Sequence, residues 1–273
     1  MDTITSLKRA TQRSFGYQWT QFADMVEANR EHFLTYIAPI EPGFFKGKLG
    51  LDAACGFGRH LFYAREFGAR MVGADFSDAI RSARAILGSQ AGASLVKADI
   101  YQLPFRRESF DFIYCLGALH HLPDPEAGFQ SLLPYLKKDG AVFIWVYSKK
   151  RWIVNRMLEA VRNITTRLPL PLLKYICWLL AFIDFYLFIY PYRLSSSLRQ
   201  CGIKIWAPPR IRLYAKFPFR VCYADWFDRL AAPIRFYYDE TDLRRWALHA
   251  GLRDVVITTT GEYGCRLLGY KAT

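Results

Sequence analysis

Hydrophobic and polar positions along residues 48–148 alternate between two periods, one typical of strands and one typical of helices. The strand-like runs are residues 48–52, 70–75, 94–99, 110–116 and 141–147, and the helix-like runs that separate them are residues 59–67, 77–87 and 124–136. Residues 236–271 add a helical run, stopped by Gly251, and two further strands. Strands that alternate with helices of about ten residues imply right-handed crossovers. The pattern therefore predicts an α/β fold with a doubly wound, mostly parallel sheet.

The stretch "LDAACGFGRH", residues 51–60, joins the first strand to the helix that follows it. In such sheets ligands bind beyond the carboxyl ends of the strands. A loop that leads into a helix offers free N–H groups to an anionic ligand, and glycine lets the backbone approach closely. The dinucleotide fingerprint G-x-G-x-x-G fails because its third glycine falls on Leu61. What remains is an acid-x-x-x-Gly-x-Gly pattern that begins at Asp52.

Four stretches of the chain, in order, resemble motifs of the class I S-adenosylmethionine-dependent methyltransferases. They are "LDAACGFGRH", "VGADFS", "VKADIYQLPF", and "FDFIYCLGALHHLPDP" followed by "LLPYLKKDGAVFIWVY". The resemblance covers residues 45–148, resumes at 236–270, and is of the kind found in ubiquinone and menaquinone biosynthesis methyltransferases. It implies a seven-stranded Rossmann-like sheet with a helical, hydrophobic and basic insertion after the fifth strand. One departure is Ala54, which stands where the family usually has the first glycine of the loop.

The resemblance also implies the residues that hold S-adenosylmethionine. Asp52 would face the ammonium group of the cofactor, and the N–H groups around Gly56 and Gly58 would approach its amino-acid end. Asp75 would take both ribose hydroxyls, and Asp99 would accept a hydrogen bond from the adenine amino group. The other expected cofactor residues are Ala54, Cys55, Phe76, Ile100, Leu116 and Gly117.

In methyl transfer the main task of the protein is to align the methyl donor and the acceptor. A general base matters only when the acceptor arrives protonated. His120 is the first candidate for this base and His121 the second. Tyr17 either closes over the site from the N-terminal arm or packs with Trp19 into the core.

Cysteine spacing gives no reason to expect a metal. The six cysteines form no C-x-x-C pair and have no histidine at zinc-like spacing. We expect reduced and mostly buried thiols. Their positions are 55, 115, 177, 201, 222 and 265.

The composition along the chain suggests four segments. Residues 1–44 form a helical arm, 45–148 the cofactor-binding core, 149–235 a basic and aromatic insertion or lid, and 236–273 a helix and strands that complete the sheet. The net charge of the chain is +13. Residues 149–220 contain fourteen basic and two acidic residues, a net charge of +12. A positive charge confined to one segment indicates that this segment binds the anionic surface of a partner.

Inside the insertion lies the apolar run "LLKYICWLLAFIDFYLFIY", residues 172–190, which is long enough to cross a bilayer. Transfer energies do not decide the matter, because the gain from the apolar residues is close to the cost of a central Asp184. A single crossing would leave the two halves of one sheet on opposite sides of a membrane. We therefore expect an interfacial helix or a shallow re-entrant hairpin; an internal lid and a true span are the alternatives.

These features predict a methyltransferase that methylates an oxygen of a small-molecule, apolar or lipid-linked acceptor at a membrane surface. The alternatives are a methyltransferase acting on RNA or another anionic soluble substrate, and a non-catalytic S-adenosylmethionine-binding scaffold. No nucleic-acid-binding module is recognisable, so a nucleic acid partner is not expected. The first residues hold no secretory signal, so we expect a cytoplasmic protein, peripheral on the inner membrane face through residues 149–220.

Overall fold

The computed structural model describes residues 3–88, 92–195, 198, 200, 202, 203 and 205–272. The chain divides into two compact units. The first unit consists of residues 1–156 and 233–273, and the second of residues 157–232. Each is described separately below.

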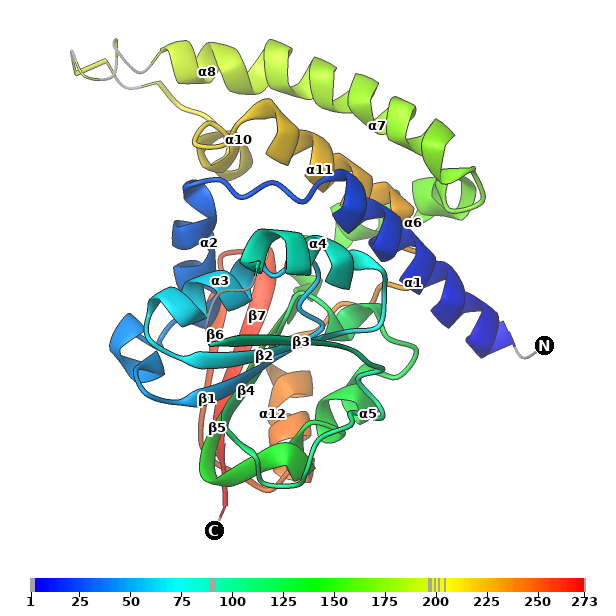
Figure 1. The fold of residues 1–273 in the computed structure, drawn as a ribbon. Helices are drawn as coiled ribbons and strands as arrows, with labels where there is room; N and C mark the ends of the chain where they lie inside the picture. The colour runs from blue at the N-terminus through cyan, green and yellow to red at the C-terminus, as the bar shows by residue number, and fades with distance from the viewer. Residues whose placement is uncertain are drawn as a thin grey trace. The chain divides into compact units, whose positions relative to one another are not determined.

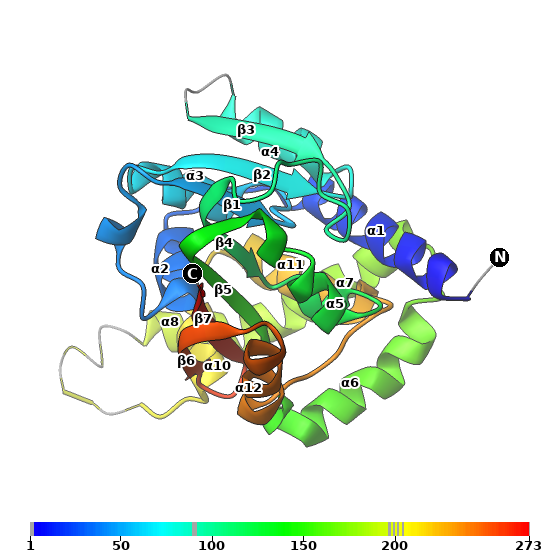
Figure 2. The same ribbon diagram turned by 90° about the horizontal axis from the view of Figure 1, so that it is seen from below.

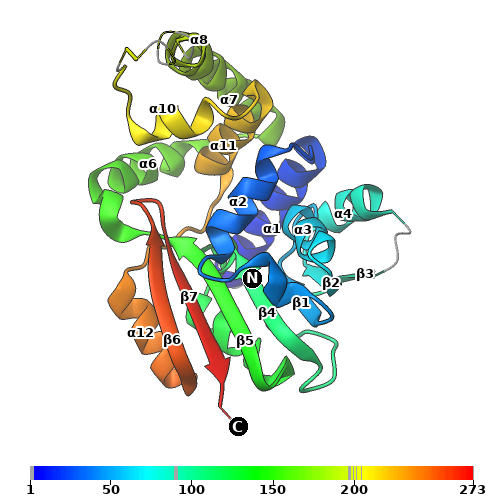
Figure 3. The ribbon, with the colours of Figure 1, turned by 90° about the vertical axis from the view of Figure 1, so that its left-hand side faces the viewer.

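The first unit is built on a seven-stranded sheet with the order β3-β2-β1-β4-β5-β7-β6, which Figure 3 shows across the view. Six strands run parallel, and β7 is antiparallel to both of its neighbours. The predicted doubly wound, mostly parallel sheet is therefore confirmed. The strands are β1 Leu49–Ala53, β2 Arg70–Asp75, β3 Ala93–Lys97, β4 Phe110–Leu116, β5 Leu136–Tyr147, β6 Leu252–Thr260 and β7 Gly264–Lys271.

Side chains of the central strands alternate between two hydrophobic cores, one on each face of the sheet. Along β4, Ile113 and Cys115 enter one core while Phe112 and Tyr114 enter the other. Helices α5 (Pro125–Gln130) and α12 (Glu240–His249) cover the first core, with Trp246 fully buried there. Helices α2 (Ala28–Ile37), α3 (Arg59–Glu66) and α4 (Ala79–Leu87) contribute to the second core. Figures 1 and 2 show α3 and α4 on the side of the sheet opposite α5 and α12.

Local sequence explains where these helices begin and end. Helix α12 starts at a capping box in which Asp239 and Asp242 each bond the other's backbone N–H, and Gly251 follows it with a φ of 61°. Helix α5 is shorter than the predicted run 124–136. Pro134 has no N–H and disfavours helix in the residue before it, so a short 3-10 turn, Leu133–Tyr135, replaces the last part.

The second unit is helical. Its elements are the greater part of α6 (Trp152–Thr165), then α7 (Leu170–Asp184), a π-helical turn Phe185–Ile189, α8 (Tyr190–Leu194), α10 (Pro209–Tyr214) and α11 (Phe219–Ala231). Helix α11 is bonded to both long helices. Its Tyr223 hydroxyl donates to the Lys174 carbonyl at 2.9 Å, and the Thr165 hydroxyl donates to the Leu230 carbonyl at 2.8 Å.

The cysteine prediction holds for the residues that the structure describes. Cys55, Cys115, Cys177, Cys222 and Cys265 are buried free thiols. Cys201 lies outside the described residues. The same is true of Arg199 and Lys204, two of the basic residues counted in the insertion.

Candidate functional site

The loop between β1 and α3 turns sharply through three residues with positive φ. Ala54, Gly56 and Gly58 have φ values of 66°, 54° and 84°. The amides of Ala54 and Cys55 both donate to the Ala74 carbonyl, at 2.7 and 3.0 Å, which ties the loop to the end of β2. Ala54 therefore adopts the conformation that favours glycine, at the position where the methyltransferase motif usually has one. The loop geometry agrees with the motif, although the residue does not.

Asp52 lies beneath this loop and is almost completely buried, with 1% of its surface exposed. Among the described residues, its Oδ2 atom has no hydrogen-bond partner. Burial raises the pKa of Asp52 to about 8, an effect that the charge of Asp75 adds to and that Tyr114 and Arg59 oppose. The hydroxyl of Tyr114 is close enough to lower this pKa but makes no hydrogen bond of normal geometry. A buried carboxyl oxygen of this kind is a natural acceptor for a cationic ligand group.

Asp75, at the end of β2, holds the neighbouring loops together. Its Oδ2 accepts from the Gly56 amide at 2.8 Å, and its Oδ1 accepts from the Ser77 amide and hydroxyl at 2.8 and 2.6 Å. Burial raises the pKa of Asp75, and the hydrogen bonds from Ser77 and Gly56 oppose this shift. Its two oxygens thus already accept three hydrogen bonds, so the predicted ribose contacts would use the lone pairs that remain.

Asp99 follows β3 and is covered by the first helix, α1 (Thr3–Gln21). The ammonium of Lys8 forms an ion pair with the Asp99 carboxylate. The same ammonium lies 5.3 Å from the ring centroid of Phe76 and 4.7 Å from that of Tyr101. Gln12 donates to the Phe76 carbonyl at 2.7 Å. The predicted adenine residues are therefore brought together, with Lys8 between them.

The same face of α1 continues toward the glycine loop and the two histidines. A Cβ placed on Gly56 would lie 3.4 Å from the indole of Trp19. The ring of Phe15 lies 4.7 Å from that of His121. Lys8, Gln12, Phe15 and Trp19 recur at the spacing of one helical face, and this signal in the sequence could have identified them.

Of the remaining predicted residues, Leu116 and Gly117 are at the end of β4 and Ile100 follows β3. Leu116 and Ile100 are each 7% exposed. Gly117 has a φ of 84°, and its amide donates to the Trp145 carbonyl at 3.0 Å. A Cβ on Gly117 would lie 3.9 Å from the ring of Trp145.

The two histidines occupy a 3-10 turn, Leu119–His121, and both are buried. Neither ring nitrogen of His120 has a hydrogen-bond partner among the described residues. Burial holds the pKa of His120 well below its ordinary value, and the charge of Arg235, together with that of His121 when its ring is protonated, adds to this shift. Nδ1 of His121 lies 2.7 Å from the Ile234 carbonyl, which only accepts hydrogen bonds. Nδ1 therefore carries the proton, and Nε2 is the basic nitrogen of a neutral His121.

Two residues beside the histidines were missed in the sequence. The ring of Tyr147, at the end of β5, lies 3.9 Å from the ring centroid of His120. The guanidinium of Arg235 lies 4.8 Å from the ring centroid of Tyr147. Because Arg235 follows the second unit, which ends at residue 232, only the fold brings it to the end of β5.

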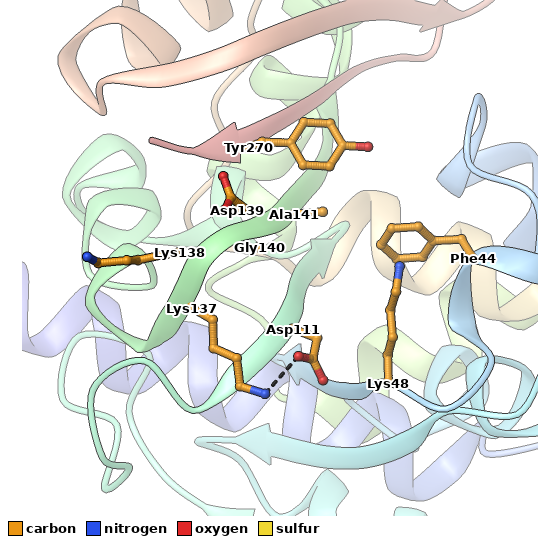
Figure 4. Close-up of a pocket in the computed structure, with 9 residues that line it drawn as sticks. All are labelled: Phe44, Lys48, Asp111, Lys137, Lys138, Asp139, Gly140, Ala141 and Tyr270. Atoms are coloured by element: carbon orange, nitrogen blue, oxygen red, sulfur yellow. Dashed lines mark hydrogen bonds and ion pairs between the residues drawn. The ribbon is translucent and has the colours of Figure 1, made fainter. Parts of the chain in front are cut away.

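A separate hollow lies at the other end of the sheet, where β4 and β5 begin (Figure 4). Lys137 forms an ion pair with Asp111 there at 2.7 Å, and the ammonium of Lys48 lies 3.4 Å from the ring centroid of Phe44. Burial lowers the pKa of Lys48, which the charge of Asp111 opposes. No predicted site residue lines this hollow. The predicted site residues lie instead at the carboxyl ends of the strands.

The residues present fit S-adenosylmethionine. The unpartnered Oδ2 of Asp52 suits an ammonium group. Gly56 and Gly58 are buried and have no side chains, and their amides donate to Asp75 and to the Cys55 carbonyl at 2.8 Å each. Sulfonium chemistry needs no metal ligands. Among the described residues there is no cluster of three or more His, Cys, Asp or Glu side chains able to hold a metal ion.

Comparisons with known proteins place this site in context. Residues 51–144 match the methyltransferase domain family. The chain is 30% identical over 143 residues to sterol 24-C-methyltransferase of Saccharomyces cerevisiae, covering 49% of this chain and 36% of that protein. It is 33% identical over 103 residues to demethylmenaquinone methyltransferase of Clavibacter sepedonicus, covering 37% of this chain and 42% of that protein. The chain thus matches less than half the length of these relatives.

Among solved structures, the chain is similar to magnesium protoporphyrin IX methyltransferase from Synechocystis PCC 6803 with bound S-adenosylmethionine. The TM-score is 0.53 at 15% identity, and the alignment covers 100% of this chain and 98% of that chain. At this level of identity the likeness shows the fold.

Proposed function

We propose that the chain is an S-adenosylmethionine-dependent methyltransferase that methylates an oxygen of an apolar or lipid-linked acceptor at the cytoplasmic face of a membrane. The match of residues 51–144 to the methyltransferase domain family supports this proposal. S-adenosylmethionine, when bound, supplies a methyl group activated by its sulfonium. In this proposal Asp52 and the loop of Gly56 and Gly58 hold the amino-acid end of the cofactor. Asp75 orients the ribose, and Asp99 and Phe76 hold the adenine.

The choice of oxygen as the methylated atom depends on which ring nitrogen of His121 carries the proton. Its Nδ1 is committed to the Ile234 carbonyl at 2.7 Å, so its Nε2 can accept a proton from a hydroxyl acceptor. Burial strongly lowers the pKa of His120, and neither of its ring nitrogens has a hydrogen-bond partner among the described residues that would orient it. We assign His121 as the base and His120, whose ring is tilted against that of Tyr147, as a neighbour that shapes the acceptor side. This reverses the order of preference given by the sequence.

The apolar acceptor is supported by the second unit and by the relatives. Many large hydrophobic side chains of residues 157–232 are exposed, including Tyr175, Leu187 and Trp206. The two relatives named above act, by their names, on a sterol and on a demethylated quinone. The sterol enzyme is named for methylation at a carbon, so the atom methylated has to be measured directly.

A labelled acceptor search tests the proposal. Purified protein is incubated with methyl-labelled S-adenosylmethionine and either a total lipid extract or total RNA. We expect label in the lipid fraction, in a product whose fragmentation shows a methyl ether. Label on a carbon atom would replace oxygen as the acceptor. Label in RNA would favour the RNA methyltransferase, and cofactor binding without transfer would favour the scaffold.

Substitution of the two histidines tests the assignment of the base. His121→Gln should lower kcat by about a hundredfold or more, because proton transfer by a positioned base contributes that much. The glutamine keeps a side-chain donor for the Ile234 carbonyl, so packing is disturbed little. His120→Gln should lower kcat less. A larger loss in His120→Gln than in His121→Gln contradicts the assignment.

A further inference from the structure

Residues Leu170–Leu194 form one continuous helix with two unlike faces. Among the described residues it is the one helix long and apolar enough to cross a membrane, and a third of its most apolar window is buried. The residues on its buried face are Leu173, Cys177, Ala181, Asp184, Phe185 and Ile189. Their spacing of three and four residues marks one side of a helix. The helix therefore has a packed side and an open side within the same apolar sequence.

The packed side contains the one acidic residue of this helix, and the carboxylate of Asp184 is fully partnered. Arg210 binds it with two guanidinium nitrogens, one of them at 2.8 Å. The indole N–H of Trp226 donates to it at 2.9 Å, and the thiol of Cys222 lies 3.5 Å away. These partners come from α10 and α11, so the charge points into the second unit. It does not reach the open side.

The open side carries eleven exposed large hydrophobic residues, which we call the docking face. They are Leu172, Tyr175, Trp178, Leu179, Phe182, Ile183, Tyr186, Leu187, Phe188, Tyr190 and Leu194. At roughly half exposure each, they present on the order of 1,000 Å² of apolar surface. Ordinary soluble monomers rarely expose more than a few hundred Å² in one patch.

Aromatic rings run along the docking face at intervals of one helical turn. Trp178 and Phe182 lie 5.3 Å apart, Phe182 and Tyr186 4.7 Å, and Tyr186 and Tyr190 5.9 Å. Tryptophan and tyrosine favour the headgroup region of a bilayer, because their rings are apolar with one polar atom.

The charged residues nearest this face are basic and lie toward its ends. Lys174 is in the first turns of the helix and Arg193 in its last turn. Residues 157–232 contain eleven basic and four acidic residues, a net charge of +7. A second copy of this chain would bring the same positive charge, whereas anionic lipid headgroups complement it.

We propose that the docking face lies in the interface of an anionic bilayer and that the helix does not cross it. The inference rests on the proposed function and names the partner that would deliver its acceptor. A crossing would carry the Asp184–Arg210 pair into hydrocarbon or separate it, and both are costly. With the pair turned inward, the helix can bury its open side in lipid and keep its packed side in protein.

Vesicle binding tests the proposal without cofactor or acceptor. The full chain is mixed with phosphatidylglycerol vesicles or with phosphatidylcholine vesicles and sedimented. We expect binding to the anionic vesicles, at least tenfold weaker binding to the neutral ones, and release by alkaline carbonate. Equal binding to both, no binding to either, or resistance to carbonate would each overturn the proposal.

Paired substitutions identify the surface. Leu179→Glu with Leu187→Glu places two charges on the docking face, where both side chains are more than half exposed, and should reduce vesicle binding at least tenfold. Leu248→Glu is the matched control, because Leu248 is 78% exposed on α12 of the first unit, and it should bind as the wild type does. Tyr175→Glu, at 73% exposure, repeats the test if the double variant unfolds by circular dichroism.

Three results contradict this surface assignment. They are unchanged binding by the folded docking-face variants, an equal loss in Leu248→Glu, and a wild-type dimer in light scattering that the docking-face variants dissociate. Failure of vesicle binding leaves the proposed methyl transfer in place, because transfer is measured with a total lipid extract and not with vesicles. Failure of transfer with intact vesicle binding leaves the docking face in place.

Discussion

Two buried aspartates, one in each unit, have opposite surroundings. Asp184 in the helical unit is bound by Arg210 and Trp226, and these hydrogen bonds keep its pKa below the ordinary value although burial opposes them. Asp52 in the sheet unit is more deeply buried, has an oxygen without a partner among the described residues, and has a pKa raised to about 8. Both are single acids within apolar sequence. Only their neighbours differ.

The difference separates a structural charge from a ligand-binding one. A buried carboxylate with a full set of donors is satisfied by the protein and leaves nothing for a ligand. A buried carboxyl group with an unpartnered oxygen costs stability, and such a cost is typical of sites that a ligand completes. We therefore assign Asp184 to the architecture of the second unit and Asp52 to the cofactor site.

The largest expected effect is that of Arg210→Met. It leaves Asp184 buried without its cation, and breaking a buried pair in this way should lower the free energy of unfolding by about 3–5 kcal/mol. Urea unfolding followed by tryptophan fluorescence measures this, since Trp226 lies in the cluster. Arg212→Met, two residues away and exposed, is the control and should change stability by about 0.5 kcal/mol or less. Similar losses in the two variants would remove the structural role of the pair.

Asp52→Asn should produce the reverse pattern. Because the carboxyl group has no full set of donors to lose, we expect little change in stability at pH 7. Loss of the charge that faces the cofactor ammonium should weaken binding by about 1.5–3 kcal/mol, which calorimetry with S-adenosylmethionine measures. Asp184→Asn should leave this affinity unchanged. Strong destabilisation by Asp52→Asn, with normal affinity for S-adenosylmethionine, would instead assign a structural role to Asp52.

The raised pKa of Asp52 makes both stability and cofactor binding depend on pH. The folded protein holds a proton on this group up to about pH 8, whereas the unfolded chain releases it near pH 4. This group therefore lowers the free energy of unfolding as pH rises through that window. Cofactor binding needs the ionised form, so affinity should increase about tenfold per unit from pH 6 toward pH 8.

Calorimetry in buffers of different ionisation enthalpy checks this linkage. At pH 7 we expect about one proton to be released when S-adenosylmethionine binds. Asp52→Asn should abolish the release. A release that persists in this variant assigns the proton to another group.

The smallest expected effect concerns the backbone beside Asp52. Ala54 has a φ of 66°, where a residue with a Cβ is strained. Ala54→Gly should raise the free energy of unfolding by about 0.5 kcal/mol, as the relief of strain slightly exceeds the added entropy of the unfolded chain. Thermal unfolding measures it, with Ala53→Gly in β1 as a control that should be destabilised. Destabilisation of both variants would show that the turn accommodates alanine without strain.

Much of the sheet unit could be predicted because its signals are local. Strand β2 and strand β4 coincide with the predicted runs, and Gly251 follows the helix that it was expected to end. The loop at Gly56 and Gly58 was placed from residue type and spacing alone. Pro134, by contrast, shortened a helix whose hydrophobic period continued past it.

The sequence by itself determined the order of the strands and helices, the glycine turn after the first strand, and the basic and apolar character of the insertion. These follow from periodicity, turn chemistry and charge, which neighbouring residues encode. The tertiary structure decided which buried groups have partners. Lys8 meets Asp99, Ile234 fixes the proton of His121, and Arg210 turns Asp184 inward. Those contacts join residues 26 to 113 positions apart, and so only the fold could specify them.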